Sequence, residues 1–170
     1  DRTSRGLGDV YKRQVIGTGL VGTFHAEAFF RNPNSELVAV CDVDKEKVNS
    51  VAQSFNCKAY EDFTKLINTE TLDAISIATP EQIRIEPAVM SVKKGLKILL
   101  EKPLGRNLEK IHELVDKIKD HKKIISVNFI LHEDPRYKLM KEKVKNDEIG
   151  NIVSCFARRR GNRFGIEIYA

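Results

Sequence analysis

The sequence predicts an α/β fold in which a doubly wound parallel sheet is followed by the start of a second, truncated α/β domain. Three observations predict this fold. Short apolar stretches alternate with helical patterns between residues 15 and 129. A glycine-rich turn follows the first stretch, and an acidic residue, Asp42, closes the second. Strands that alternate with helices form a parallel sheet through right-handed crossovers, so all three features fit one architecture.

The first expected strand is short, because only Val15 and Ile16 are apolar before Gly17. Apolar stretches bordered by turn residues predict five further strands, at residues 36–42, 58–60, 72–78, 97–100 and 124–129. Amphipathic spacing predicts the intervening helices at residues 20–30, 44–55, 61–67, 83–94 and 108–119. A helix at 136–145 and a strand at 152–157 then break the alternation.

The glycine-rich turn has the spacing of a phosphate-binding loop and consists of Gly17, Thr18, Gly19, Leu20, Val21 and Gly22. Glycines at these positions let a strand turn tightly into a helix and bring backbone N–H groups against a pyrophosphate. Asp42, at the end of the next strand, is placed to accept a hydrogen bond from a ribose 2′-hydroxyl. The hexapeptide alone is weak evidence, but with both strands it predicts a dinucleotide site. Because a carboxylate repels a 2′-phosphate, NAD is expected in preference to NADP.

Two further segments end strands at the same edge of the sheet, where open α/β folds bind their ligands. They are Thr79-Pro80, after the fourth strand, and Glu101-Lys102-Pro103, after the fifth. Thr79-Pro80 has a plain alternative explanation, since a proline can simply end a strand. Lys102 can likewise be an ordinary solvated lysine. Its position at a strand end favours a role in orienting a substrate hydroxyl or relaying a proton, because burial readily lowers the pKa of a lysine.

The histidines and cysteines predict no nucleophile and no metal site. His25 lies early in the first helix and is expected to pack or to support other residues, and His132, after the sixth strand, is a weaker candidate for a substrate contact. No Ser–His–Asp, Cys–His or metal-ligand spacing is present. Three scattered cysteines match no disulfide framework, which favours a reducing, cytoplasmic compartment.

Composition excludes several classes of protein. The chain has 170 residues, 41% of them hydrophobic, which is enough for a packed core. Of its net charge of +5, the first fourteen residues supply +2, and most other lysines alternate with acidic residues on helices. The basic run at 158–160 has no interleaved aromatic residues, so no nucleic-acid partner is expected. No apolar stretch approaches the length of a membrane span, so no membrane partner is expected either.

Both ends of the sequence look cut. Lys12, Arg13 and Gln14 lie where a buried first strand needs apolar residues. Residues 1–14 are therefore interpreted as a non-native leader, with a genuine polar tail as the alternative. Residues 164–170 stop amid strand-like alternation. The expected domains are this leader, a dinucleotide-binding domain at 15–129, and the beginning of a truncated substrate domain at 130–170.

Together these residues resemble the glucose–fructose oxidoreductase/inositol dehydrogenase family, also called Gfo/Idh/MocA. The resemblance covers residue 15 to the end of the chain. It rests on the glycine turn followed by His25-Ala26, on Asp42, on Thr79-Pro80 and on Glu101-Lys102-Pro103. Segments 134–137 and 148–153 are similar to the family's passage into its second domain.

The resemblance implies a Rossmann domain that holds NAD or NADP and a sugar, polyol or sugar derivative as substrate. It would make Lys102 the catalytic lysine. The cofactor would be lined by Gly17, Thr18, Gly19, Leu20, Val21, Gly22, Asp42, Thr79, Pro80, Glu101 and Lys102. The full-length protein is expected to be a homo-oligomer. The alternative is a non-catalytic nucleotide-binding or sensor protein on the same fold, which needs the glycines and Asp42 but not Lys102.

The sequence departs from the family's pattern in two respects. Arg84 stands where the family commonly has a histidine, four residues after the proline of Thr79-Pro80. The acid/base residues that the resemblance implies further downstream lie beyond Ala170. The 170-residue chain is therefore expected to bind a dinucleotide without turning over substrate.

Overall fold

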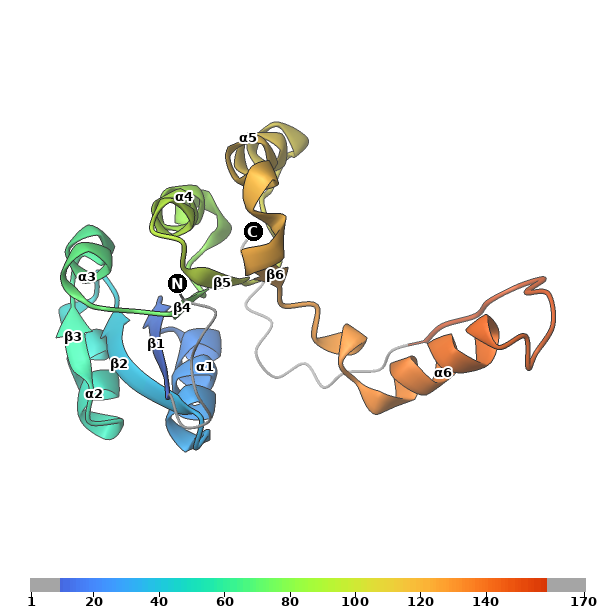
Figure 1. Ribbon diagram of the computed structural model, residues 1–170, viewed down its shortest axis with the longest axis horizontal. Coiled ribbons are helices and arrows are strands. Elements are labelled where there is room, and N and C mark those ends of the chain that lie inside the picture. Colours follow the sequence, from blue (N-terminus) through green and yellow to red (C-terminus); the bar gives the residue numbers. More distant parts are fainter. Residues whose placement is uncertain (1–9, 159–170) are drawn as a thin grey trace. The chain divides into compact units, whose positions relative to one another are not determined.

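The computed structural model describes residues 10–158, and a six-stranded parallel sheet forms the centre of its first unit (Figure 1). The strand order is β3-β2-β1-β4-β5-β6, so the expected doubly wound fold is confirmed. β1 lies between β2 and β4, which makes the carboxyl ends of β1 and β4 the switch point at which such folds bind ligands. The strands are β1 (Tyr11–Ile16), β2 (Ser35–Cys41), β3 (Lys58–Tyr60), β4 (Ala74–Ile77), β5 (Lys97–Leu100) and β6 (Ile125–Val127).

Helices lie on both faces of this sheet. α1 and α2 lie on one face, and α3, α4 and α5 lie on the other (Figure 1). Consecutive strand residues point to opposite faces, so Val15 belongs to the hydrophobic cluster under α1 and α2, whereas Ile16 belongs to the larger cluster on the opposite face. The helices are α1 (Leu20–Arg31), α2 (Lys45–Ser54), α3 (Phe63–Thr69), α4 (Ile85–Lys93) and α5 (Leu108–Ile118), with 3₁₀ turns at Glu81–Ile83, Lys119–Ile124 and Ile130–His132.

β1 begins at Tyr11, so its first four residues, 11–14, overlap the expected leader. These four residues pair in parallel with β2 over their whole length, and Arg13 and Gln14 pair with β4 as well. The guanidinium of Arg13 lies 4.9 Å from the ring centroid of Phe29, and such cation–π contact lets a basic side chain occupy a sheet position. Gln14 is fully buried. Residues 1–9 lie outside the described residues, and the non-native origin of residues 1–14 stays a prediction.

The chain divides into two compact units after Phe129. The described part of the second unit contains one α-helix, α6 (Pro135–Lys145), one residue longer than expected at its start. The strand expected at 152–157 is wrong, because residues 152–158 form neither a helix nor a strand paired with another strand. Val153 and Phe156 are 96% and 90% exposed, so this alternating pattern has no sheet to pack on within the described residues. The segment 164–170 lies outside them.

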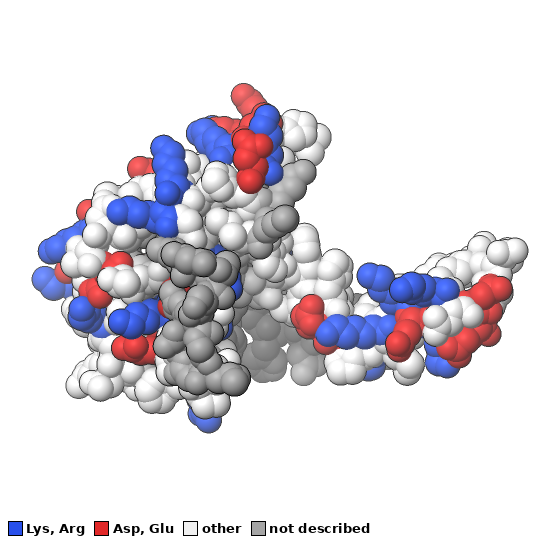
Figure 2. Space-filling view, viewed as in Figure 1, with Lys and Arg blue, Asp and Glu red and all other residues white. Residues whose placement is uncertain are grey.

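The charges of the described residues are mixed rather than separated. On the face shown in Figure 2, basic and acidic side chains are interspersed over both units. Most described ion pairs are exposed and local, such as Lys117 with Glu113 and Lys143 with Glu148. Within residues 10–158, no helix combines the length and the apolar composition needed to cross a membrane.

Candidate functional site

In the glycine turn at the end of β1, the backbone lies close to neighbouring backbone at two positions, Gly17 and Gly22. Gly17 has φ +92°, a conformation that side chains other than glycine rarely adopt, and a Cβ there would lie 2.8 Å from the backbone of Ala78. A Cβ on Gly22, in the first turn of α1, would lie 1.7 Å from the carbonyl oxygen of Gly17. The turn therefore fits between the end of β4 and the start of α1 only because both residues are glycine.

Gly19 plays a different part, because a Cβ added to it meets no atom within 4 Å. Gly19 is the N-cap of α1, and no side chain caps this helix. By contrast, α2, α3 and α5 are each capped by an Asp or Asn side chain. The N–H groups of Leu20 and Val21, in the first turn, therefore have no side-chain cap at the positive end of the helix. This open, uncapped helix end fits the pyrophosphate of a dinucleotide.

Asp42, directly after β2, lies against the glycine turn. Its Oδ2 accepts hydrogen bonds from the backbone N–H of Thr18 at 2.7 Å and from the Thr18 hydroxyl at 3.0 Å. Its Oδ1 accepts one from the N–H of Asp44 at 3.1 Å. Asp42 is only half-buried, so lone pairs of the carboxylate remain available to a ribose hydroxyl. Thr18 is buried and contributes by fixing this carboxylate.

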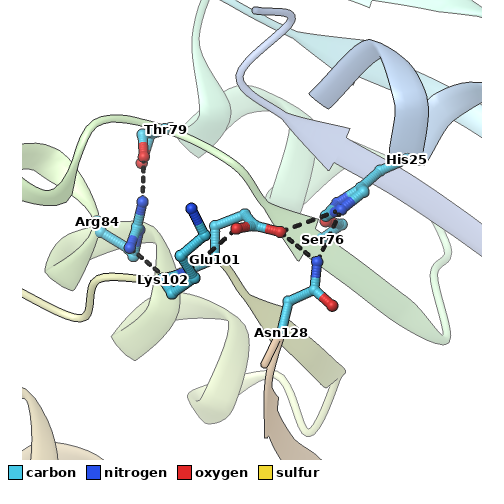
Figure 3. Close-up of polar contacts among 7 residues, drawn as sticks. All are labelled: His25, Ser76, Thr79, Arg84, Glu101, Lys102 and Asn128. Atoms are coloured by element: carbon cyan, nitrogen blue, oxygen red, sulfur yellow. Dashed lines mark hydrogen bonds and ion pairs between the residues drawn. The ribbon is translucent and has the colours of Figure 1, made fainter. Parts of the chain in front are cut away.

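A second cluster lies at the carboxyl ends of β4, β5 and β6 and centres on Glu101, whose carboxylate is buried (Figure 3). Oε1 lies 3.2 Å from Nε2 of His25 and also accepts a hydrogen bond from the Asn128 amide. Oε2 accepts a hydrogen bond from the backbone N–H of Lys102 at 3.1 Å. These donors come from α1, from the end of β6 and from the loop after β5, so one carboxylate joins three elements of the fold.

His25 connects this cluster to β4. Its Nδ1 lies 2.6 Å from the hydroxyl of Ser76. Burial lowers the pKa of His25, an effect that the charge of Glu101 only partly opposes, so the imidazole is neutral at pH 7. A neutral ring has one donor and one acceptor nitrogen. The arrangement that satisfies Ser76 and Glu101 has Ser76 donating to Nδ1 and Nε2–H donating to Glu101. The Asn128 amide nitrogen, 3.2 Å from Nε2, then donates to Glu101 rather than to the ring.

The series Ser76–His25–Glu101 has the composition of a hydrolase triad, but it cannot act as one. Ser76 is fully buried in the middle of β4, a central strand, so its hydroxyl cannot reach a substrate. The cluster instead fixes the carboxylate beside Lys102. No group of three or more His, Cys, Asp or Glu side chains within residues 10–158 is arranged to hold a metal ion.

Arg84, the residue that departs from the family's pattern, is also buried and lies on the other side of Glu101 (Figure 3). Its guanidinium donates to the backbone carbonyls of Thr79, Glu101 and Pro103. The loop after β4 and the loop after β5 are thereby joined. The hydroxyl of Thr79 is buried and has no hydrogen-bond partner among the described residues.

Lys102 itself is exposed, so the burial invoked for it from the sequence is not present in the described residues. Its neighbours are held firmly all the same: Glu101 by side-chain hydrogen bonds, and the carbonyls of Glu101 and Pro103 by Arg84. An exposed ammonium on a fixed backbone at the carboxyl edge can meet a substrate hydroxyl that enters from solvent.

The structure brings the expected site residues to one edge of the sheet, in two groups. The glycine turn and Asp42 form the first group, at β1 and β2, and Thr79, Pro80, Glu101 and Lys102 form the second, at β4 and β5. Sequence reasoning missed Ser76 and Asn128 and assigned His25 only a general supporting role. A lone hydroxyl within the apolar stretch 74–78, and an amide near the carboxyl end of the expected strand 124–129, were the available signals.

Three comparisons with known proteins bear on this geometry. The chain matches, over residues 12–129, a family described as "Oxidoreductase family, NAD-binding Rossmann fold". It is 31% identical over 138 residues to an inositol 2-dehydrogenase of Rubrobacter xylanophilus, covering 80% of this chain and 40% of the relative. It is 29% identical over 144 residues to a glucose-6-phosphate 3-dehydrogenase of Bacillus subtilis, covering 82% of this chain and 39% of the relative.

Among solved structures, the chain resembles myo-inositol dehydrogenase from Lactobacillus casei in complex with NAD(H) and myo-inositol. The TM-score is 0.77 at 32% identity, with 83% of this chain and 43% of the other covered. The chain thus spans about two fifths of the length of the curated relatives it matches. The matched region contains both groups of site residues, and its description agrees with the expected NAD cofactor.

Proposed function

This chain belongs to the Gfo/Idh/MocA family of oxidoreductases, and we propose that it supplies the NAD-binding half of a dehydrogenase acting on a polyol, sugar or sugar derivative. The uncapped N-terminus of α1 would bind the pyrophosphate. Asp42, already oriented by Thr18, would accept the hydrogen bonds of the adenosine ribose.

The single observation that supports catalysis, rather than binding alone, is the position of Lys102. It lies at the carboxyl end of β5, next to a carboxylate that three side chains (His25, Asn128 and, through His25, Ser76) and one backbone N–H organise. When bound, NAD supplies a hydride acceptor for the carbon that bears the substrate hydroxyl. Lys102 would hold that hydroxyl and take part in moving its proton, and the carboxyl edge would keep substrate and cofactor within reach of each other.

The substrate class is supported by the names of the relatives, which include an inositol dehydrogenase and a sugar-phosphate dehydrogenase. We propose a polyhydroxylated substrate for the full-length protein, and a reducing, cytoplasmic compartment in keeping with three free cysteines. For the 170-residue chain alone we propose dinucleotide binding without turnover.

The proposal is tested by assaying NAD reduction by the full-length protein over a panel of inositols, aldoses and sugar phosphates. Lys102→Met is expected to lower kcat at least about a hundredfold, because general acid–base contributions are typically that large. Lys97→Met is the matched control, since Lys97 is an exposed lysine at the opposite end of the same strand. Equal activity of the Lys102 variant and the control would remove the catalytic role of Lys102. NAD binding by the full-length protein without turnover of any substrate on the panel would favour the sensor alternative.

A further inference from the structure

Arg84 occupies a position that is costly for an arginine. It is 3% exposed, and burial lowers the pKa of its guanidinium. It is the N-cap of α4, where the helix dipole disfavours a positive charge. Its Nε has no hydrogen-bond partner among the described residues. A buried positive charge at this position does not stabilise α4. The role of Arg84 is therefore inferred from the groups that its guanidinium contacts.

Those contacts are three backbone carbonyls on two loops. Thr79 belongs to the loop after β4, whereas Glu101 and Pro103 belong to the loop after β5 and flank Lys102 on either side. A guanidinium presents several N–H donors in one rigid plane, so a single side chain can fix the spacing of the two loops. Glu101 and Glu81 supply opposite charge nearby.

We propose that Arg84 is a positioning residue for the nicotinamide half of the dinucleotide site. The inference rests on the proposed function and deepens it. In a doubly wound sheet the dinucleotide crosses the switch point, with its adenosine half at the glycine turn and at Asp42. The nicotinamide half then extends over the ends of β4 and β5, the two segments that Arg84 joins. Arg84 acts there through Thr79 and through the backbone on both sides of Lys102.

This role is separable from that of the Glu101 cluster. His25 and Asn128 hold the carboxylate of Glu101, whereas Arg84 holds backbone carbonyls. Arg106 and Glu81 also link the segments after β5 and β4, but from the surface, since the Arg106 side chain is 69% exposed. Arg106 therefore offers a matched control: an arginine that connects the same two segments without reaching the buried carbonyls.

The test uses the 170-residue chain and two probes, NADH and ADP-ribose, the latter lacking the nicotinamide. Dissociation constants are measured by calorimetry, and the emission of bound NADH at saturation reports the environment of the nicotinamide ring. The chain contains no tryptophan, so NADH emission is free of energy transfer from that residue. The variants are Arg84→Met, Arg84→Lys and Arg106→Met.

Arg84→Met is expected to weaken NADH binding about tenfold, the loss expected for a charge-assisted hydrogen-bond set, or to return the emission of bound NADH toward that of free NADH. ADP-ribose binding stays within about twofold of the parent, because the β1–β2 half is untouched. Arg84→Lys restores part of the lost signal, and Arg106→Met leaves both probes unchanged.

Three results would overturn the assignment. Unchanged NADH affinity and emission in Arg84→Met would remove the positioning role. So would an equal loss of ADP-ribose and NADH binding, which indicates general unfolding, or an equal effect of Arg106→Met. If the parent chain binds neither probe, the proposed function fails first, and that outcome is distinct from a failure confined to the Arg84 variants.

Discussion

At the β1–β2 end of the carboxyl edge, the candidate site is formed by the backbone of the glycine turn; we call this the backbone half. At the β4–β6 end it is formed by buried side chains that hydrogen-bond to one another; we call this the side-chain half. The first half depends on Gly17 and Gly22, where an added Cβ would clash with the backbone. It also depends on Gly19, where an added Cβ would contact no atom within 4 Å. The second half depends on Glu101, a buried carboxylate whose donors come from α1, the end of β6 and its own loop.

The two halves are therefore sensitive to opposite kinds of substitution. The backbone half is destabilised by adding a Cβ to Gly17 or Gly22, because close-packed protein interiors have no room for an additional atom. The side-chain half is damaged by removing one, because a buried donor or acceptor is then left without a partner. His25 connects the two halves, since α1 begins at the glycine turn and delivers the imidazole to Glu101.

The largest expected effect is on the backbone half. Gly22→Ala would place a Cβ 1.7 Å from the carbonyl oxygen of Gly17, so α1 or the turn must shift. We expect a loss of about 3 kcal/mol or more in the free energy of unfolding, measured by urea denaturation. Gly19→Ala is the control for glycine replacement: it is expected to cost less than about 1 kcal/mol yet to weaken NADH binding, because its methyl group occupies the open cradle. Equal stability of the two variants would contradict the packing argument.

Next in size is the loss of the Glu101 charge. Glu101→Gln replaces one carboxylate oxygen with an amide NH₂, so at least one of its three donors meets another donor. We expect a loss of about 2 kcal/mol in the free energy of unfolding. Glu86→Gln, on the exposed face of α4, is the matched control and is expected to change stability by less than about 0.5 kcal/mol. A Glu101→Gln variant as stable as the control would show that the cluster is not satisfied as described.

Protonation of His25 should make the free energy of unfolding depend on pH. Its pKa is lowered in the folded state, so as pH falls below about 6.5 the unfolded chain takes up the proton first. Stability that is fully present above the unfolded pKa is then lost progressively toward the folded pKa. We expect the free energy of unfolding to fall between pH 7.5 and 5.5, and His25→Gln to flatten part of that slope. An unchanged slope in His25→Gln would assign the pH dependence to other groups.

The smallest expected effect concerns Thr18. Thr18→Val removes the hydroxyl that donates to Asp42, while the backbone N–H of residue 18 still donates to the same oxygen. We expect a loss of about 1 kcal/mol in stability and a small weakening of NADH binding, because Asp42 becomes less well oriented. Thr23→Val is the control, since Thr23 also donates its hydroxyl within this turn, to the carbonyl of Thr18, but not to Asp42. A similar effect of both variants on NADH binding would show that the orientation of Asp42 is not the cause.

The same contrast explains what the sequence could predict. The backbone half was predictable because its signals are local: glycine spacing, an apolar stretch on each side, and Asp42 twenty residues after Gly22. The side-chain half was predictable only in part. Glu101 and Lys102 follow a recognisable strand, but Asn128 meets His25 across 103 residues of sequence, and no local pattern encodes that pairing.

Two segments differ from the secondary structure expected of them, for physical reasons. Lys12, Arg13 and Gln14 are polar and were expected to precede the first strand. Pairing with β2, pairing of Arg13 and Gln14 with β4, and an aromatic contact for Arg13 place them in β1. Residues 152–157 have a strand-like alternation, but a β-strand requires a partner strand for its hydrogen bonds, and the apolar side chains of this segment are exposed in the described residues. In both segments, pairing with neighbouring strands determines whether a β-strand forms, and the alternation of apolar residues alone does not.

The central claim, that the first half is an NAD site selected by Asp42, is tested most directly by titrating the 170-residue chain with NADH and with NADPH. We expect saturable NADH binding and NADPH binding that is at least about tenfold weaker. In Asp42→Ala the difference between the two dissociation constants should be smaller, because the carboxylate that repels a 2′-phosphate is gone. Absence of saturable NADH binding, or NADPH binding as tight as that of NADH in the parent chain, would contradict it.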